Sequence, residues 1–139
     1  MDGASSNDSQ YLIEVMKAGA LLQKVQNRDS AALSAREIFS MATDQGAACI
    51  NMQDQIGSLV EGKKADLIAL DLRKPNTTPC YDPIASLVYS GNSENIAMVM
   101  VEGEIIFDQG GFTRVNEADI LKRAQQKAEK IYQYSTQNK

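Results

Sequence analysis

The architecture of this chain depends most on residues 56–71, the deciding stretch, which read Ile56-Gly57-Ser58-Leu59-Val60-Glu61-Gly62-Lys63-Lys64-Ala65-Asp66-Leu67-Ile68-Ala69-Leu70-Asp71. Its first half has the composition of turns, in which glycine supplies backbone conformations that other residues avoid. Its second half is a short apolar run bounded by Asp66 and Asp71, and this pattern predicts a buried strand. The stretch therefore predicts a turn that leads the chain into a sheet.

Helical patterns precede this stretch. Apolar residues recur at helical spacing and predict a first helix over 9–24. Ser34 followed three positions later by Glu37 is a capping-box pattern, in which each side chain satisfies a free amide at the start of a helix. This second helix is predicted to run to residue 45, with Gly46 as its left-handed cap.

A helix, a hairpin and another helix are predicted after the strand. Asp82-Pro83 combines a capping residue with a proline at the first helical position, which predicts a helix over 83–89. Glu102-Gly103 separates two apolar runs and predicts the tight turn of a β-hairpin. Asn116 then caps a helix with apolar residues at helical period. The predicted fold class is α+β, in three segments: 1–53, 54–115 and 116–139.

Composition excludes several classes of function. The chain has 139 residues, 43% of them hydrophobic, and this predicts a single domain with a real core. A net charge of −4 without a basic stripe argues against nucleic acid as a partner. No apolar run is long enough to cross a membrane, and 1–10 is polar, so we expect a cytoplasmic protein. Cys49 and Cys80 lack CxxC spacing, and Cys49 is predicted to be a small buried residue.

The deciding stretch resembles the G-S-L-x-x-G-K-x-A-D-L-x-x-x-D signature near the C-terminus of amidohydrolases, a superfamily of metal-dependent hydrolases. Val99-Met100-Val101-Glu102-Gly103-Glu104-Ile105-Ile106 is similar to the hairpin that follows it, and Ala35-Arg36-Glu37 resembles part of the last barrel helices. The likeness is nearest to the adenosylhomocysteine and methylthioadenosine deaminase or chlorohydrolase branch. It implies that 1–53 is the C-terminal end of a (β/α) barrel, 54–115 part of its small composite β-sandwich, and 116–139 the C-terminal helix.

The first residues resemble the end of the family's eighth barrel strand, where a metal-binding aspartate precedes G-A-A-S-N-N. Asp2-Gly3-Ala4-Ser5-Ser6-Asn7-Asp8 is similar to it, and the resemblance implies that Asp2 holds the family's catalytic and metal-ligand position. Full-length members of the family use Zn or Fe held by several histidines, whereas this chain contains no histidine. We therefore expect no cofactor in the isolated chain and no catalysis by it alone.

Two other motifs could be mistaken for sites. Gly62-Lys63-Lys64 lacks the spacing of a phosphate-binding loop and precedes a strand, so it is interpreted as a turn. The acids Glu61, Asp66 and Asp71 bracket a strand on differing faces and are interpreted as structural rather than metal-binding.

Three functions stay open. The favoured one is the C-terminal part of a hydrolase of C–N or C–Cl bonds in aminated heterocycles, inactive by itself. The others are one half of a split hydrolase, and a freestanding oligomerisation or interaction module derived from the family. The absent barrel should leave strand edges and apolar helix faces uncovered, so a homodimer or a partner carrying the missing barrel is expected.

Overall fold

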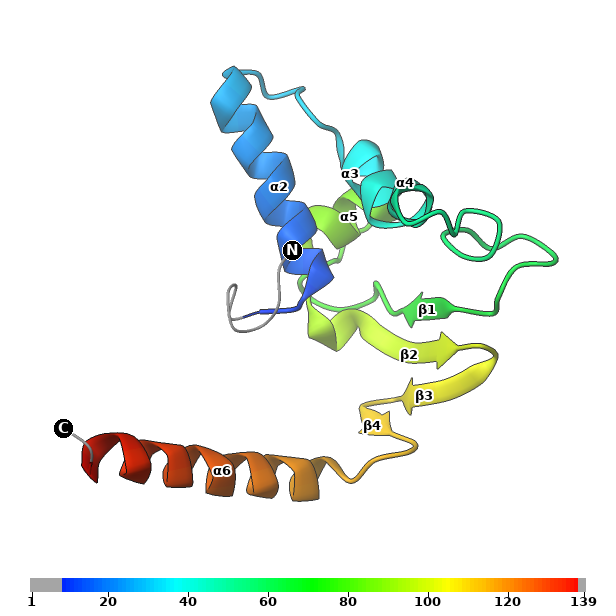
Figure 1. Cartoon of the computed structure of the whole chain (residues 1–139). Coiled ribbons are helices and arrows are strands. Elements are labelled where there is room, and N and C mark those ends of the chain that lie inside the picture. The colour runs from blue at the N-terminus through cyan, green and yellow to red at the C-terminus, as the bar shows by residue number, and fades with distance from the viewer. Residues whose placement is uncertain (1–8, 138–139) are drawn as a thin grey trace.

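The computed structural model describes residues 9–137, and it combines a cluster of helices with one sheet (Figure 1). The helices are α2 (Leu12–Asn27), α3 (Ala35–Ala42), α4 (Asp44–Cys49), α5 (Pro83–Ser90), the 3-10 helix η1 (Ser93–Asn95) and α6 (Glu117–Gln137). The strands are β1 (Leu67–Leu70), β2 (Ile96–Val101), β3 (Glu104–Asp108) and β4 (Gly111–Phe112). The predicted α+β class is confirmed. Helices α2 to α5 lie together, the sheet lies beside them, and α6 extends away from both.

The sheet is antiparallel with the strand order β1-β2-β3-β4. The predicted hairpin is present, and both of its turn residues have positive φ, +50° at Glu102 and +82° at Gly103. Such a turn matches the twist of the strands that it joins. A second turn of the same kind, at Gln109 and Gly110, connects β3 to the two-residue β4. The sequence analysis did not predict β4, because so short a strand has no periodicity.

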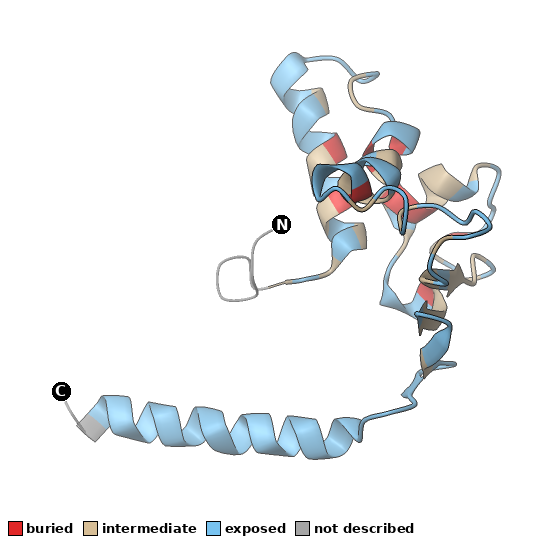
Figure 2. Cartoon of the chain, turned by 45° about the vertical axis from the view of Figure 1, so that its right-hand side comes forward, coloured by how far each residue is buried: buried red, intermediate tan, exposed pale blue. Residues whose placement is uncertain are grey.

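The hydrophobic core lies within the helical cluster (Figure 2). Met16 and Ala20 of α2 pack with Ala35 and Ile38 of α3 and with Val88 of α5, which is fully buried. Burial of the larger side chains, Met16, Ile38 and Val88, contributes about 1.5–3 kcal/mol each. Helix α5 comes from the predicted segment 54–115 and packs on helices from 1–53, so the two segments share this core.

The helix boundaries differ from the predicted ones for local reasons. Helix α2 starts and ends three residues later than expected, and it stops where Arg28 adopts the left-handed conformation, with φ +51°. The predicted second helix is wrong as one element: it breaks at Thr43 into α3 and α4. Gly46 lies inside α4 and does not cap a helix. A Cβ there would approach the Met41 carbonyl oxygen to 2.9 Å, so glycine allows the close approach of the chain.

Helix capping follows the predicted patterns elsewhere. The Ser34 amide donates to the Glu37 carboxylate at 2.7 Å, and the Glu37 amide donates back to the Ser34 hydroxyl at 3.3 Å. Asp82 accepts from the first amides of α5, and the Asp119 amide donates to the Asn116 side chain at 3.2 Å before α6. All three predicted N-caps are therefore confirmed.

Much apolar surface is uncovered by the described part of the chain. Large hydrophobic side chains are exposed on α2, on the loop before β1, on the sheet and on α6; they include Leu22, Val25, Leu59, Ile68, Phe112 and Ile131. Cys49 is exposed, so its predicted burial is wrong. None of the described helices combines the length and apolarity that a membrane span requires.

Candidate functional site

Asp2, the predicted catalytic and metal-ligand position, lies outside the described residues, as do Ser5, Ser6 and Asn7. Its role therefore stays a prediction. Within 9–137, no three carboxylates or thiols come together in a way that could hold a metal ion. Glu61, Asp66 and Asp71 belong to no such group; Asp66 accepts a hydrogen bond from the Glu102 amide and Asp71 accepts one from the Arg73 guanidinium.

Lys63, in the middle of the deciding stretch, holds a loop together. Its ammonium donates to the carbonyls of Gln53 at 2.5 Å and Ile56 at 3.3 Å, and to the Ser58 hydroxyl at 2.7 Å. Three oxygens of one loop thus converge on one cation. The predicted turn role of the lysine motif is confirmed, and its positive charge is already used inside the protein.

The loop that Lys63 closes is docked on the helical cluster through Gly57. This glycine has a φ of +88°, and a Cβ on it would lie 2.7 Å from the Ala47 Cβ and 3.0 Å from the Asp44 Cα. Only a glycine can make this close approach in this conformation. Gly62, with a φ of +92°, has nothing within 4 Å of its Cβ position, so its requirement is conformational alone.

The end of the same stretch is tied to the β2–β3 turn. Lys64 donates to the Glu102 carboxylate at 2.6 Å, and this hydrogen bond is the main reason that the pKa of Lys64 is raised. Asp66 accepts from the Glu102 amide at 2.6 Å, and the Gly103 amide donates to the Ala65 carbonyl at 3.0 Å. These contacts fix the hairpin against the start of β1.

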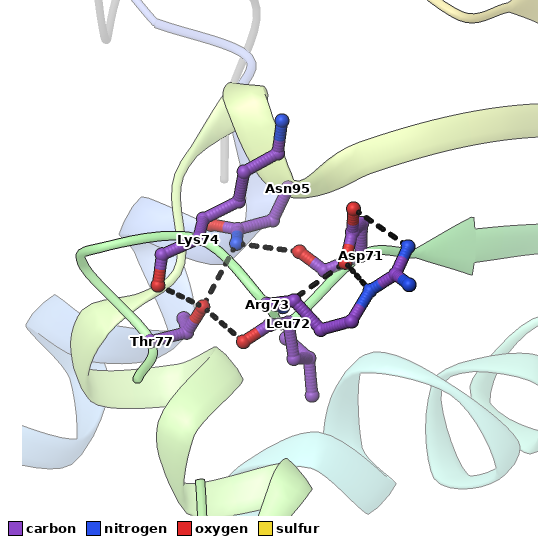
Figure 3. Close-up of polar contacts among 6 residues, drawn as sticks. All are labelled: Asp71, Leu72, Arg73, Lys74, Thr77 and Asn95. Carbon is purple, nitrogen blue, oxygen red and sulfur yellow. Dashed lines mark hydrogen bonds and ion pairs between the residues drawn. The ribbon is translucent and has the colours of Figure 1, made fainter. Parts of the chain in front are cut away.

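A buried polar hub follows β1 (Figure 3). Asn95 is fully buried, and its amide nitrogen donates to the Asp71 carbonyl at 2.9 Å and to the Thr77 hydroxyl at 3.2 Å. Its side-chain oxygen accepts from Asn76 at 2.8 Å and from the Asn92 amide at 3.0 Å. The Asp71 amide donates to the Asn95 backbone carbonyl at 2.7 Å. The hub joins the end of β1 to η1 and to the loop before α5.

The acid at the edge of this hub is paired. The Asp71 carboxylate accepts from the Arg73 guanidinium at 2.9 Å and from the Arg73 amide at 3.0 Å. These hydrogen bonds, the side-chain one first, lower the pKa of Asp71 to about 2. An open surface hollow of about 700 Å³ adjoins it, with Lys74, Glu94 and Gln109 among its lining residues. Charges of both signs line this hollow, and it brings together none of the predicted site residues.

The hub was missed by the sequence analysis. Asn95 precedes a strand in a polar segment, and nothing in its neighbourhood distinguishes it from an exposed turn residue. Three of its four side-chain partners lie 18 to 24 positions away, so only the folded chain reveals them; the fourth, Asn92, lies three positions away. Its geometry stabilises the fold and brings no nucleophile or general base to an open site.

Comparison with known proteins agrees with this fold. The amidohydrolase family profile matches residues 1–106. An S-triazine hydrolase from Gordonia rubripertincta is 44% identical over 105 residues, which are 76% of this chain and 22% of that protein. A 5'-deoxyadenosine deaminase from Methanosarcina acetivorans is 36% identical over 130 residues, which are 94% of this chain and 30% of that protein. The chain belongs to the amidohydrolase family.

Solved structures show the same arrangement. A zinc-bound adenosine deaminase from Xanthomonas campestris superposes with a TM-score of 0.91 at 28% identity, over 95% of this chain and 30% of that one. A zinc complex of atrazine chlorohydrolase from Arthrobacter aurescens gives 0.80 at 28% identity, over 87% of this chain and 27% of that one. The resemblance to deaminases and triazine hydrolases is thus confirmed, and the chain spans less than a third of the length of these relatives.

The metal of these relatives does not fit the described residues. Zinc in a hydrolase is held by three or more nitrogen, sulfur or carboxylate ligands with one position left open. The chain has no histidine, and the described residues gather no other donor set. Full-length members of the family bind zinc, and nothing in 9–137 provides a place for it.

Proposed function

We propose that this chain is the C-terminal part of a cytoplasmic amidohydrolase that cleaves C–N or C–Cl bonds of aminated heterocycles, and that it is not catalytic by itself. One observation carries the proposal: 95% of the chain superposes on 30% of a zinc-bound adenosine deaminase, yet the chain contains no histidine. It therefore combines the fold of one part of such an enzyme with the absence of any histidine that could bind the metal.

The exposed apolar surface supports this proposal. Leu22 and Val25 of α2 are 66% and 75% exposed, and Ile68 of β1 is 58% exposed. Isolated soluble domains rarely leave several such patches uncovered. Strand β1 also has one edge with no partner among the described strands. These surfaces are the ones that the rest of a hydrolase would cover.

The first test is an assay of the purified chain with added zinc. Substrates are those named for its relatives: 5'-deoxyadenosine, 5-methylthioadenosine, S-adenosylhomocysteine and an s-triazine. We expect no turnover above a protein-free blank and no zinc retained after gel filtration. Turnover by the chain alone would refute the proposal, because it would require a metal site that residues 9–137 do not contain.

The second test is complementation. The 5'-deoxyadenosine deaminase of Methanosarcina acetivorans, truncated to remove the part that matches this chain, supplies the missing segment and its own metal ligands. We expect deamination to appear when the two polypeptides are co-expressed. The matched control is Asp2→Asn, which keeps the size of the side chain and removes the carboxylate; it should assemble equally well and restore no activity. Equal activity with Asp2→Asn would remove Asp2 from the site.

A second candidate is an interaction module derived from the family. The observation that favours it is helix α6, which extends away from the remaining structure with its apolar residues exposed. Under this function, the wild-type chain would bind a partner and would restore no activity in the complementation experiment.

A further inference from the structure

Helix α6 is not buried by any other part of the described chain. Every residue from Glu117 to Thr136 is exposed, and Figures 1 and 2 show the helix projecting clear of the sheet and of the helical cluster. Most helices in proteins are stabilised mainly by packing of an apolar face, and no such packing covers the 21 residues of α6 within the described chain. We therefore expect α6 to pack on a partner surface.

The face available for that surface is a narrow apolar stripe. Four of its large side chains are 48% to 70% exposed, and alanines occupy its centre. Between residues 120 and 132, no charged residue falls inside the stripe. The lysines, the arginine and the glutamate of this segment lie on the borders of the stripe or on the opposite face of the helix. We call these residues the α6 stripe: Ile120, Leu121, Ala124, Ala128, Ile131 and Tyr132.

The α6 stripe has a two-fold symmetry in its sequence. Counted from Gln126, Leu121 and Ile131 are each five positions away, and Ala124 and Ala128 are each two positions away. Ile120 and Tyr132 are each six positions away. In an antiparallel pair of identical helices with its two-fold axis level with residue 126, large residues face large ones and alanine faces alanine. This is the self-complementary arrangement that a symmetric dimer needs.

We propose that α6 is a dimerisation arm: the α6 stripe of one copy packs antiparallel on the α6 stripe of a second copy. The alanines at the centre let the two backbones approach closely, and leucine and isoleucine close the contact at both ends. This proposal goes beyond the proposed function and does not rest on it, because pairing needs neither metal nor substrate.

The placement of the arm is shared with a solved relative, although the arm lies beyond the family profile. The family profile ends at residue 106, before β4 and α6. A superposition over 95% of the chain with a TM-score of 0.91 cannot omit a 21-residue helix, so the adenosine deaminase holds its helix in a similar position. Locally, the Thr113 hydroxyl donates to the Ile105 carbonyl at 2.6 Å and Arg114 pairs with Glu104. These contacts anchor the start of the arm on β3.

The oligomeric state of the full chain tests the proposal. Sedimentation equilibrium should give about twice the 15.2 kDa of one chain at high micromolar concentration. Leu121→Glu should weaken the dimer at least tenfold, because it places two charges in the contact. Gln126→Glu is the matched control, since it makes the same charge change on the opposite face and should alter the dissociation constant less than twofold. Glutamate is a good helix former, so neither change disfavours the helix itself.

Cross-linking tests the orientation. In a background with Cys49→Ser and Cys80→Ser, a chain with Ala124→Cys is mixed with a chain with Ala128→Cys and oxidised. Antiparallel pairing brings the unlike positions to disulfide distance and should give mostly mixed dimers. Dimers of like chains would indicate parallel pairing and would overturn the arrangement. A monomeric wild type would overturn the dimerisation arm and would indicate that the rest of a hydrolase covers the α6 stripe. A dimer that Leu121→Glu leaves intact would also overturn it, because another face would then drive association.

Discussion

Replacing Asn95 by alanine tests how the sheet is joined to the loop before α5. Asn95 is 0% exposed, and its side chain uses both donors and both lone pairs of its oxygen. The structure contains no redundant partner for the Asn92 amide among the described hydrogen bonds, so that donor is left unsatisfied in Asn95→Ala. The hub should therefore open around residue 95 before the helical cluster does.

The magnitude follows from the four hydrogen bonds. Each contributes a net of about 0.5–1.5 kcal/mol, and a buried donor left without a partner costs about 1–3 kcal/mol. Two partners keep other bonds: Thr77 still donates to the Leu72 carbonyl at 2.8 Å, and Asn76 to the Ser90 carbonyl at 2.8 Å. We therefore expect Asn95→Ala to lower the free energy of unfolding by about 3 kcal/mol, a large part of the total for a small domain.

The measurement is urea unfolding followed by circular dichroism, at one fixed protein concentration because the chain is expected to associate. Thr77→Val is a graded comparison that keeps the side-chain shape and removes the hydroxyl; it should cost about 1–2 kcal/mol. Asn27→Ala, at an exposed position, is the control and should stay within about 0.5 kcal/mol. The reasoning is refuted if Asn95→Ala costs no more than this control.

Asn95→Asp separates the hydrogen bonds from the volume of the side chain. The carboxylate has nearly the same shape but no donors, and burial raises the pKa of such a group above its unfolded value of about 4. Stability is then lost as pH rises through the window between the unfolded and folded pKa values. The deficit of this variant relative to wild type should be smaller at pH 4 than at pH 7; a deficit independent of pH would indicate that the carboxyl is hydrated.

Three further predictions concern the caps and turns. Ser34→Ala removes one half of the capping box and should cost about 1 kcal/mol in urea unfolding, whereas no effect would mean that water replaces the hydroxyl. Gly57→Ala should lower the free energy of unfolding by at least about 1 kcal/mol more than Gly62→Ala. Both glycines have positive φ, but only a Cβ at position 57 would clash with helix α4; equal losses in thermal unfolding would contradict the close approach. Because the pKa of Asp71 is lowered to about 2, its ion pair contributes stability above the unfolded pKa near 4 and loses it as pH falls towards 2. Arg73→Ala should flatten this part of the stability–pH curve, and an unchanged acid slope would show that the pair contributes nothing.

The sequence predicts the elements of this chain better than it predicts their ends. Ser34, Asp82 and Asn116 were identified as caps because a capping side chain acts within three residues of itself, which is the range that a pattern can show. The break at Thr43 was missed because it depends on α4 folding back against α3, and Gly46 was read as a cap for the same reason. Exposure of Cys49 follows from that same break, since it places the end of α4 at the surface.

In the candidate site, too, the sequence predicts local features and does not predict contacts between distant residues. The structural role of Gly62-Lys63-Lys64 was predicted from the absence of phosphate-loop spacing, but the three oxygens bound by Lys63 were not. The sequence analysis did not predict the Asn95 hub, because three of the four side-chain partners of Asn95 are far from it in sequence and belong to loops or strand ends. The position predicted for catalysis, Asp2, came from family resemblance and lies outside the described residues.

The contacts of the deciding stretch explain how a chain without histidine keeps so strong a family likeness. Lys63 closes a loop, Gly57 docks that loop on the helices, and Asp66 holds the following hairpin, so each of these residues acts on the fold and none on a reacting atom. These contacts join residues within 9–137 and involve no histidine, so they do not depend on the metal ligands of the relatives. The signature therefore reports the architecture of an amidohydrolase, and its described contacts stabilise the fold. If a partner that carries the histidines assembles a hydrolase with this chain, a substitution of Lys63 should reduce turnover. It should do so by reducing the amount of folded protein, because Lys63 holds a loop together.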